Sequence, residues 1–273
     1  MAWDLTGLFR SKIKALEMLS LIEGTKPCAR IMVHERDLKK VLDFFSENKI
    51  HTAISGFKVK KESSNSHYSD KSMKINPNSN EKGHFFVYAS KTKELAENAK
   101  KHESEGKHFE LGIALGYPKC CCRFFTENFS EDSYDLTLKT LRNSQGDFHF
   151  QNNIAARHFD FSLLFHFPCS FDCRESLRIS KTSLEILENS SKETAALFVK
   201  KLKSGIIYTK GNGVFLLEEY EKEGNKIKII KITGTADNGL FNGLSNAGEF
   251  EFDKDKKISV EGKEKVAYFL EFT

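Results

Sequence analysis

The sequence predicts an α+β protein with a small N-terminal α/β unit, a central helical cysteine-rich region and a C-terminal antiparallel β region. Helix-like and strand-like runs alternate over residues 1–105. Five of the six cysteines then fall between residues 120 and 173, where the pattern is mainly helical. Short β-prone runs separated by Gly, Asn, Asp and Lys fill the end of the chain. We therefore place the regions at 1–105, 106–203 and 204–273.

The N-terminal unit is expected to contain three helices and three strands. The expected helices cover residues 4–22, 36–48 and 91–105, and the expected strands cover 29–34, 51–60 and 84–90. Leu38, Val41 and Phe45 recur at steps of three and four, which places them on one helical face. Residues 62–80 are rich in Ser and Asn and poor in apolar side chains, so they predict a mobile loop.

The central region is expected to be helical around two cysteine motifs. Asn152–Phe165 reads as an amphipathic helix, and a further helix is expected from Pro168 to about residue 188. Ser190–Glu193 matches a capping box that would start the last helix, and Gly205 is a suitable stop for it.

The C-terminal region is expected to be an antiparallel sheet or a small barrel, because its apolar runs are short and separated by turn residues. The expected strands cover residues 206–208, 214–217, 227–232, 250–252, 258–260 and 266–269.

Composition sets the class of protein. The chain has 273 residues, 39% of them hydrophobic and 24 of them phenylalanine, which is enough to build a sizeable core. The net charge of +4 permits an acidic partner such as RNA but does not by itself indicate one. Residues 1–5 lack the layout of a signal peptide, and no apolar stretch approaches the roughly 18 residues of a membrane span. We therefore expect a cytoplasmic protein without a membrane partner.

The most informative feature is an aromatic-Pro step placed twice just ahead of cysteine, in Gly116–Cys122 and in His166–Cys173. Only four prolines occur in the chain, and two of them lie in these motifs. Proline favours the start of a helix, so each motif predicts a helix with thiols in its first turns. The positive end of the helix dipole stabilises a thiolate there. In a reducing compartment, clustered thiols favour metal binding or redox chemistry over disulfides.

Four thiols are predicted metal ligands, those of Cys120, Cys121, Cys169 and Cys173. His166 is predicted as a fifth ligand or as a group that supports the ligands from outside the centre. Cys169 and Cys173 are four residues apart and would share one helical face, and His166 could reach the same point across the proline. Cys120 and Cys121 could both face a centre beyond the end of their helix. Four such thiolates suit an iron–sulfur cluster, our first expectation, or zinc, our second. With one labile ligand, sulfur transfer or a related modification would follow.

Two alternatives stay open at this point. In a metal-free thiol enzyme, Cys169 would be the nucleophile, Cys173 or Cys121 the resolving thiol and His166 the base. In a structural or binding module, the cysteines would be inert core residues, because free cysteine is often buried. Phosphate-binding glycine loops and a GxSxG elbow are absent from the sequence, which disfavours nucleotide and serine-hydrolase chemistry.

Further polar residues flank the motifs and rank below the cysteines, because such residues are usually on the surface or in caps. They are Arg123, Asn152, Asn153, Arg157, His158, Arg174, Glu175 and Ser176. Cys122 is less well placed than its two neighbours, and Cys28 is isolated in the sequence.

The two motifs resemble those of an uncharacterised prokaryotic, largely archaeal, family of unknown function. The family pattern is Leu-Gly-Tyr-Pro-x-Cys-Cys followed by His-x-Pro-Cys-x-x-x-Cys. Leu115–Cys121 and His166–Cys173 match it here, and the likeness covers roughly residues 83–185. Cys122 is an addition to the pattern. Since no activity is assigned to the family, the resemblance implies the motif boundaries and not a reaction.

Overall fold

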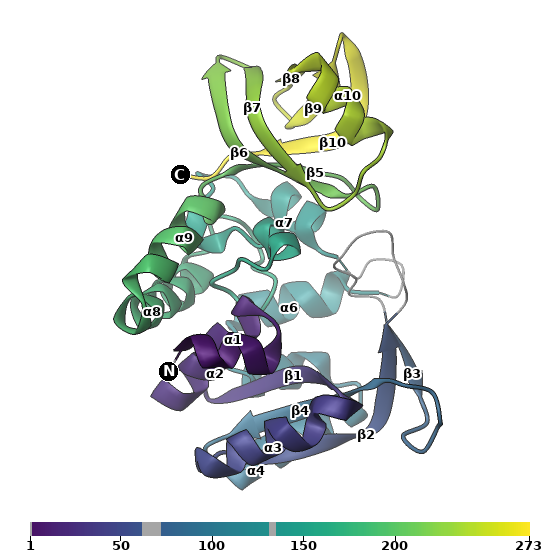
Figure 1. Cartoon of the computed structure of the whole chain (residues 1–273), viewed down its shortest axis with the longest axis vertical. Coiled ribbons are helices and arrows are strands. Elements are labelled where there is room, and N and C mark those ends of the chain that lie inside the picture. The colour runs from purple at the N-terminus through teal and green to yellow at the C-terminus, as the bar shows by residue number, and fades with distance from the viewer. Residues whose placement is uncertain (1, 62–71, 131–134) are drawn as a thin grey trace.

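The computed structural model describes residues 2–61, 72–130 and 135–273. The chain combines helices with antiparallel sheets, which confirms the predicted α+β class. Figure 1 shows the N-terminal sheet at one end, a β-barrel at the other end, and helices α6 to α9 between them.

The N-terminal sheet has four antiparallel strands in the order β1-β4-β2-β3. The strands are β1 (Cys28–His34), β2 (His51–Lys61), β3 (Ser72–Ile75) and β4 (His84–Ser90). Of the predicted mobile loop at 62–80, residues 62–71 lie outside the described residues. Ser72–Ile75 forms a strand against β2, which is a correction to that part of the prediction.

Helices cover both faces of this sheet. Helices α1 (Ala2–Phe9), α2 (Lys12–Glu23) and α3 (Leu38–Glu47) cover one face, and α4 (Lys93–Ser104) and α5 (His108–Ala114) cover the other. Side chains alternate along a strand, so Ala29 and Ile31 of β1 pack toward α1–α3 while Cys28 packs toward α4 and α5.

The single helix expected over residues 4–22 is two helices, and a 3₁₀ turn, η1 (Glu35–Asp37), precedes α3. The chain breaks at Arg10, whose φ of 53° lies in the left-handed region, and Ser11 then caps α2. The carboxylate of Asp160 accepts the backbone N–H groups of Lys12 and Ile13. A distant residue therefore helps to fix the start of α2, which local periodicity does not reveal.

The central region packs its helices on one large apolar core. It contains α6 (Lys119–Asn128), α7 (Thr137–Asn143), η2 (Phe150–Asn152), η3 (Ala155–Phe159), α8 (Arg174–Ser190) and α9 (Lys192–Leu202). The amphipathic helix predicted for Asn152–Phe165 is wrong, because only the short turn η3 forms there. Asn153 explains the difference: its side chain accepts the N–H of Ala156 and donates to the carbonyl of Leu202. Such side-chain bonds compete with helical ones.

Three predicted helix ends also move. The helix expected from Pro168 begins at Arg174. The cap of α9 is Ser191, which accepts the N–H of Thr194, and not Ser190. The helix ends at Leu202, so Gly205 opens the next strand instead of stopping the helix.

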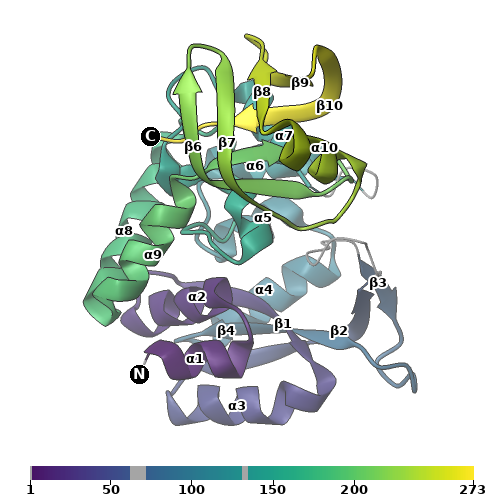
Figure 2. The same ribbon diagram turned by 45° about the horizontal axis from the view of Figure 1, so that its top comes forward.

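The C-terminal strands form a closed barrel in the order β10-β5-β6-β7-β8-β9, which confirms the predicted antiparallel sheet or barrel. They are β5 (Gly205–Tyr208), β6 (Val214–Glu223), β7 (Lys226–Gly234), β8 (Glu249–Phe252), β9 (Lys257–Val260) and β10 (Lys263–Leu270). Helix α10 (Gly239–Ala247) lies against the barrel, as Figure 2 shows, and buries Leu244 in its core.

The barrel shares a wall with the central region. Ile207 and Phe215 point into the barrel core, whereas their neighbours Ile206 and Leu216 join the core of the central helices. Among the helices in the described part of the chain, none has the length and apolar character needed to cross a bilayer.

Candidate metal centre

The first cysteine motif starts a helix, as predicted. Gly116 has φ +80°, and a Cβ at this position would lie 2.6 Å from Cδ of Pro27, so only glycine fits. Pro118 is then the N-cap residue of α6. Cys120 and Cys121 follow in the first turn of this helix, where unpaired backbone N–H groups favour a thiolate.

The second motif is built differently from the prediction. Cys169 and Cys173 do not share a helical face, because Cys173 is the N-cap residue of α8 and Cys169 lies in the loop before it. The side-chain amide of Asn152 holds this loop by donating to the carbonyls of Phe171, at 3.1 Å, and Cys173, at 3.0 Å. Phe171 is fully buried, so the loop is fixed by tertiary contacts.

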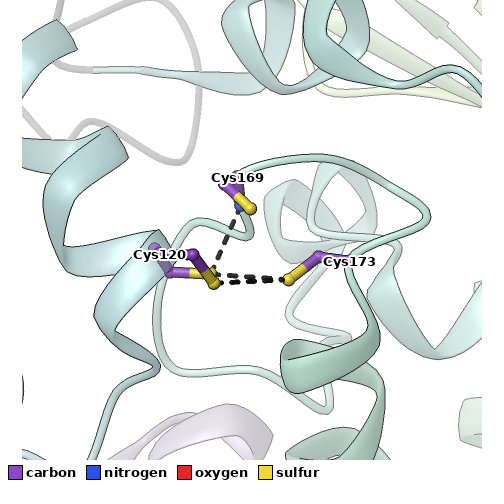
Figure 3. A group of neighbouring side chains, drawn as sticks. Cys120, Cys169 and Cys173 are labelled. Carbon is purple, nitrogen blue, oxygen red and sulfur yellow. Dashed lines mark hydrogen bonds between the residues drawn. The ribbon is translucent and has the colours of Figure 1, made fainter.

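Four cysteines converge at this point, from the start of α6 and from the loop ahead of α8 (Figure 3). The Sγ atoms of Cys120, Cys121, Cys169 and Cys173 all lie within 4.8 Å of one another. Cys120 is 3.8 Å from Cys121 and 3.9 Å from Cys173, and Cys121 is 3.8 Å from Cys173. The backbone N–H of Cys169 also donates to Cys121 Sγ, at 3.4 Å. These four side chains could hold a metal ion.

The four thiols differ in exposure and in acidity. Cys121 and Cys173 are buried, Cys169 is half-buried and Cys120 is exposed. Hydrogen bonds with Cys121 and Cys169 lower the pKa of the Cys173 thiol, and Ser176 adds to this effect. The pKa of Cys121 is raised by its bonds with Cys169 and Cys173 and by burial. Cys173, at the N-terminus of α8, is therefore the first of the buried pair to become a thiolate.

Cys169 is a poor free nucleophile in this arrangement. Its bond with Cys121 lowers its pKa, but the bond with Cys173 and burial outweigh that effect and raise the pKa to about 12. At neutral pH it stays a thiol unless a metal ion replaces its proton.

His166 is linked to the cysteines through two hydrogen bonds that share Ser176, and it is not part of the group that could share an ion. A hydrogen bond of 2.9 Å joins its Nε2 to Ser176 Oγ, and a second bond of 3.2 Å joins Ser176 Oγ to Cys121 Sγ. Its ring centroid is 4.9 Å from that of Tyr117. Burial, helped by the charge of Lys26, lowers the pKa of His166 to about 3, so the ring is neutral. His166 thus orients Ser176.

Two cysteines stay outside the cluster. The thiol of Cys122 donates to the carbonyl of Tyr117 and occupies the space beside Gly112, where a Cβ would lie 2.6 Å from the sulfur. Cys28 is buried on β1 among apolar side chains. Burial is the main cause that raises the pKa of Cys122 to about 11 and that of Cys28 to about 12. Both behave as small core residues.

Sequence reasoning ranked two important residues too low and missed a third. Asn152 and Ser176 stood only among the flanking polar residues, yet one holds the second loop and the other contacts Cys121. Lys26 was not singled out, although its buried ammonium donates to the carbonyl of Leu115 beside the first motif, at 2.8 Å. A contact across 89 residues leaves no local pattern in the sequence.

Fold and site together define an α+β protein with a four-cysteine centre that could hold a metal ion, placed between an N-terminal sheet and a C-terminal barrel. Comparison with family models, curated proteins and solved structures finds no match to this chain. The resemblance of the two motifs to an uncharacterised family therefore stays a prediction.

Proposed function

We propose that this protein binds one tetrahedral zinc ion through Cys120, Cys121, Cys169 and Cys173. The sulfur–sulfur spacing carries the proposal. A zinc ion bound by four thiolates at about 2.3 Å has sulfur–sulfur edges of about 3.8 Å. The three edges among the sulfurs of Cys120, Cys121 and Cys173 are 3.8, 3.8 and 3.9 Å. These three sulfurs therefore stand at the spacing that a single ion requires, and the sulfur of Cys169 lies within 4.8 Å of each of them.

An iron–sulfur cluster, the first expectation from the sequence, is the second choice. In a cubane cluster each cysteine binds a different iron, and the sulfide-bridged irons hold the thiolates farther apart than a single ion does. The close spacing of the sulfurs supports one ion over such a cluster. A single iron ion would also fit four thiolates, and spectroscopy separates it from colourless zinc.

The role that four thiolate ligands support is structural. Zinc sites with four cysteines are closed, whereas catalytic zinc sites keep one position for water. Here the ion would join the start of α6 to the loop ahead of α8. These segments otherwise meet through the Cys169 N–H bond to Cys121, the Ser176 bond and side-chain packing. Reduced thiols of this kind agree with the predicted cytoplasmic location.

Metal analysis of anaerobically purified protein tests the proposal. We expect about one zinc per chain and no matching sulfide. Replacing zinc by Co²⁺ is expected to give the intense thiolate bands of a tetrahedral site. The Cys173→Ser variant is expected to bind zinc at least about a hundredfold more weakly, because it loses a ligand and not merely an outer contact.

The matched control is Cys122→Ser, which changes the neighbouring thiol of the same helix without touching the group. It is expected to keep full zinc content. If the analysis finds iron and an equal amount of sulfide, the same four cysteines bind an iron–sulfur cluster and not zinc. Full zinc retention in Cys173→Ser, or metal-free wild-type protein with rapidly alkylated Cys173, would overturn the proposal and favour thiol chemistry.

A further inference from the structure

A polar pocket lies in the N-terminal unit. No residue of the cysteine motifs lines it. It has a volume of about 230 Å³ and is formed by the junction of α1 and α2, the end of β1, η1 and the first residue of β4. The charged and imidazole side chains that line it are Arg10, Lys14, His34, Arg36, Asp37 and His84. The guanidinium groups of Arg10 and Arg36 face the one carboxylate of Asp37, so this part of the pocket is positively charged even with neutral histidines.

Asp37 holds the two arginines over the pocket. Its Oδ1 lies 3.3 Å from Nη2 of Arg10, and its Oδ2 lies 3.4 Å from Nε of Arg36. The carboxylate balances only one of the two guanidinium charges. Each guanidinium carries five N–H donors, so these contacts leave donors that an incoming anion can use. Both arginine side chains are about 60% exposed, with 60% for Arg10 and 61% for Arg36, and are open to a ligand from solvent.

Two further groups add positive charge and a donor. The ammonium of Lys14 is fixed 2.7 Å from the carbonyl of Met32, which keeps its charge in the wall of the pocket. His34 Nδ1 accepts the backbone N–H of Arg36, so a neutral His34 carries its proton on Nε2 and is a donor there. The pocket therefore gathers donors and cations around one space.

Arg10 has a strained backbone conformation at the junction of α1 and α2. Its φ of 53° lies in the left-handed region, which glycine adopts without strain and other residues adopt at a cost in stability. The position follows the end of α1, where glycine is the usual residue. Arginine at this position is less stable than glycine would be, but it places a guanidinium group beside the pocket.

We propose that this pocket binds a phosphate group, with the guanidinium groups of Arg10 and Arg36 as its principal donors. Guanidinium matches the paired oxygens of phosphate and keeps its charge at any physiological pH. The phosphate oxygens must compete with the carboxylate of Asp37 for the two arginines. Binding is therefore favoured when more than one negative charge lies near the pocket, either on one phosphate monoester or on neighbouring phosphodiesters of one strand. The phosphate can come from a nucleic-acid backbone or from a small phosphorylated molecule. This proposal does not depend on the metal site.

Calorimetry with inorganic pyrophosphate, and fluorescence anisotropy with a labelled single-stranded RNA, test the proposal on the full chain. Arg36→Gln and Arg10→Gly are each expected to weaken binding of the better probe at least about tenfold, the loss expected for charge-assisted hydrogen bonds. Lys40→Gln is the control, because the substitution removes the same charge as Arg36→Gln. Lys40 is exposed on α3 and does not line the pocket. It is expected to change affinity less than about twofold.

Thermal unfolding of the same variants separates binding from folding. Arg10→Gly relieves the left-handed strain, so its midpoint is expected to stay equal or rise while its affinity falls. Tighter RNA binding than pyrophosphate binding would assign the phosphate to a nucleic-acid backbone, and the reverse order would assign it to a small molecule. No binding of either probe, or equal weakening by Lys40→Gln and Arg36→Gln, would overturn the proposal.

Discussion

His166 has a buried imidazole ring, and this burial has a consequence for stability in acid. Its pKa falls to about 3 in the folded protein because burial and the nearby Lys26 both disfavour the charged ring. The unfolded chain takes up this proton near pH 6.5. Between about pH 6.5 and 3 the unfolded state binds one proton more than the folded state. The free energy of unfolding therefore falls by about 1.4 kcal/mol for each pH unit of acidification, through this group alone.

The His166→Gln variant removes this titration, so we expect a shallower loss of stability between pH 7 and pH 5 than in the wild type. Urea unfolding at several pH values, with both proteins in the same metal state, measures the difference in slope. The variant should be less stable at pH 7, because it loses the hydrogen bond between the imidazole ring and Ser176. Parallel pH profiles for the two proteins would show that His166 is not held neutral in the fold.

At the residue scale, chemistry was easier to predict than position. The four cysteines were identified from their motifs, because thiols near a proline-marked helix start have a local signature. His166 was predicted as a fifth ligand or a supporting group, and as the base in a metal-free enzyme; it lies outside the four-cysteine group and bonds to Ser176. The loop that places Cys169 depends on Asn152, a residue far enough away that no spacing rule connects them.

Helix α2 is buried on two sides, and its ion pair is correspondingly costly. Leu16 packs into the central core, whereas Met18 and Leu21 pack into the N-terminal core. Glu17 of this helix lies 3.4 Å from the ammonium of Lys26, and both side chains are less than 9% exposed. Burial raises the pKa of Glu17 and lowers that of Lys26, so each charge is disfavoured by its surroundings.

We expect Lys26→Met to lower the free energy of unfolding by about 3 kcal/mol or more, because the carboxyl of Glu17 loses its partner inside the protein. Adding Glu17→Leu should recover most of that loss, since apolar residues of similar volume replace both charges. Urea denaturation of the wild type, both single variants and the double variant closes the cycle. Additive losses in the double variant would mean that the two side chains do not stabilise one another.

Periodicity predicted most elements of the chain and failed where side chains compete with the backbone. The predicted strands of the barrel lie within the observed ones, because short apolar runs between turn residues have few alternatives. The false helix at 152–165 had the correct apolar spacing, but Asn153 bonds to backbone groups instead. The break between α1 and α2 is fixed in part by Asp160, which lies 148 residues beyond Lys12.

At the scale of the molecule, one apolar core connects regions that the sequence divides into three. Leu16 of α2, the central helices and one face of β5 and β6 all contribute to it. The opposite face of the same strands fills the barrel, which therefore has a second core of its own. The cysteine cluster lies in the central region, away from the inner barrel core. If an ion is lost from the cysteine cluster, the central region should therefore be destabilised before the barrel.

Metal removal tests this order. An ion that links Cys120 and Cys173 closes a loop with a sequence separation of 53 residues. The lower chain entropy of the unfolded state then contributes about 4 kcal/mol to the free energy of unfolding. We expect chelation to lower the thermal midpoint and to speed amide exchange in α6 and in the loop that carries Cys169. Strands β7 to β9 should keep their protection, because Phe250 and Ile258 belong to the barrel core.

The Cys122→Ser protein, treated in the same way, should respond like the wild type. Faster exchange spread evenly over centre and barrel would show that the chain unfolds as one unit. No change at α6 would show that the ion carries none of its stability.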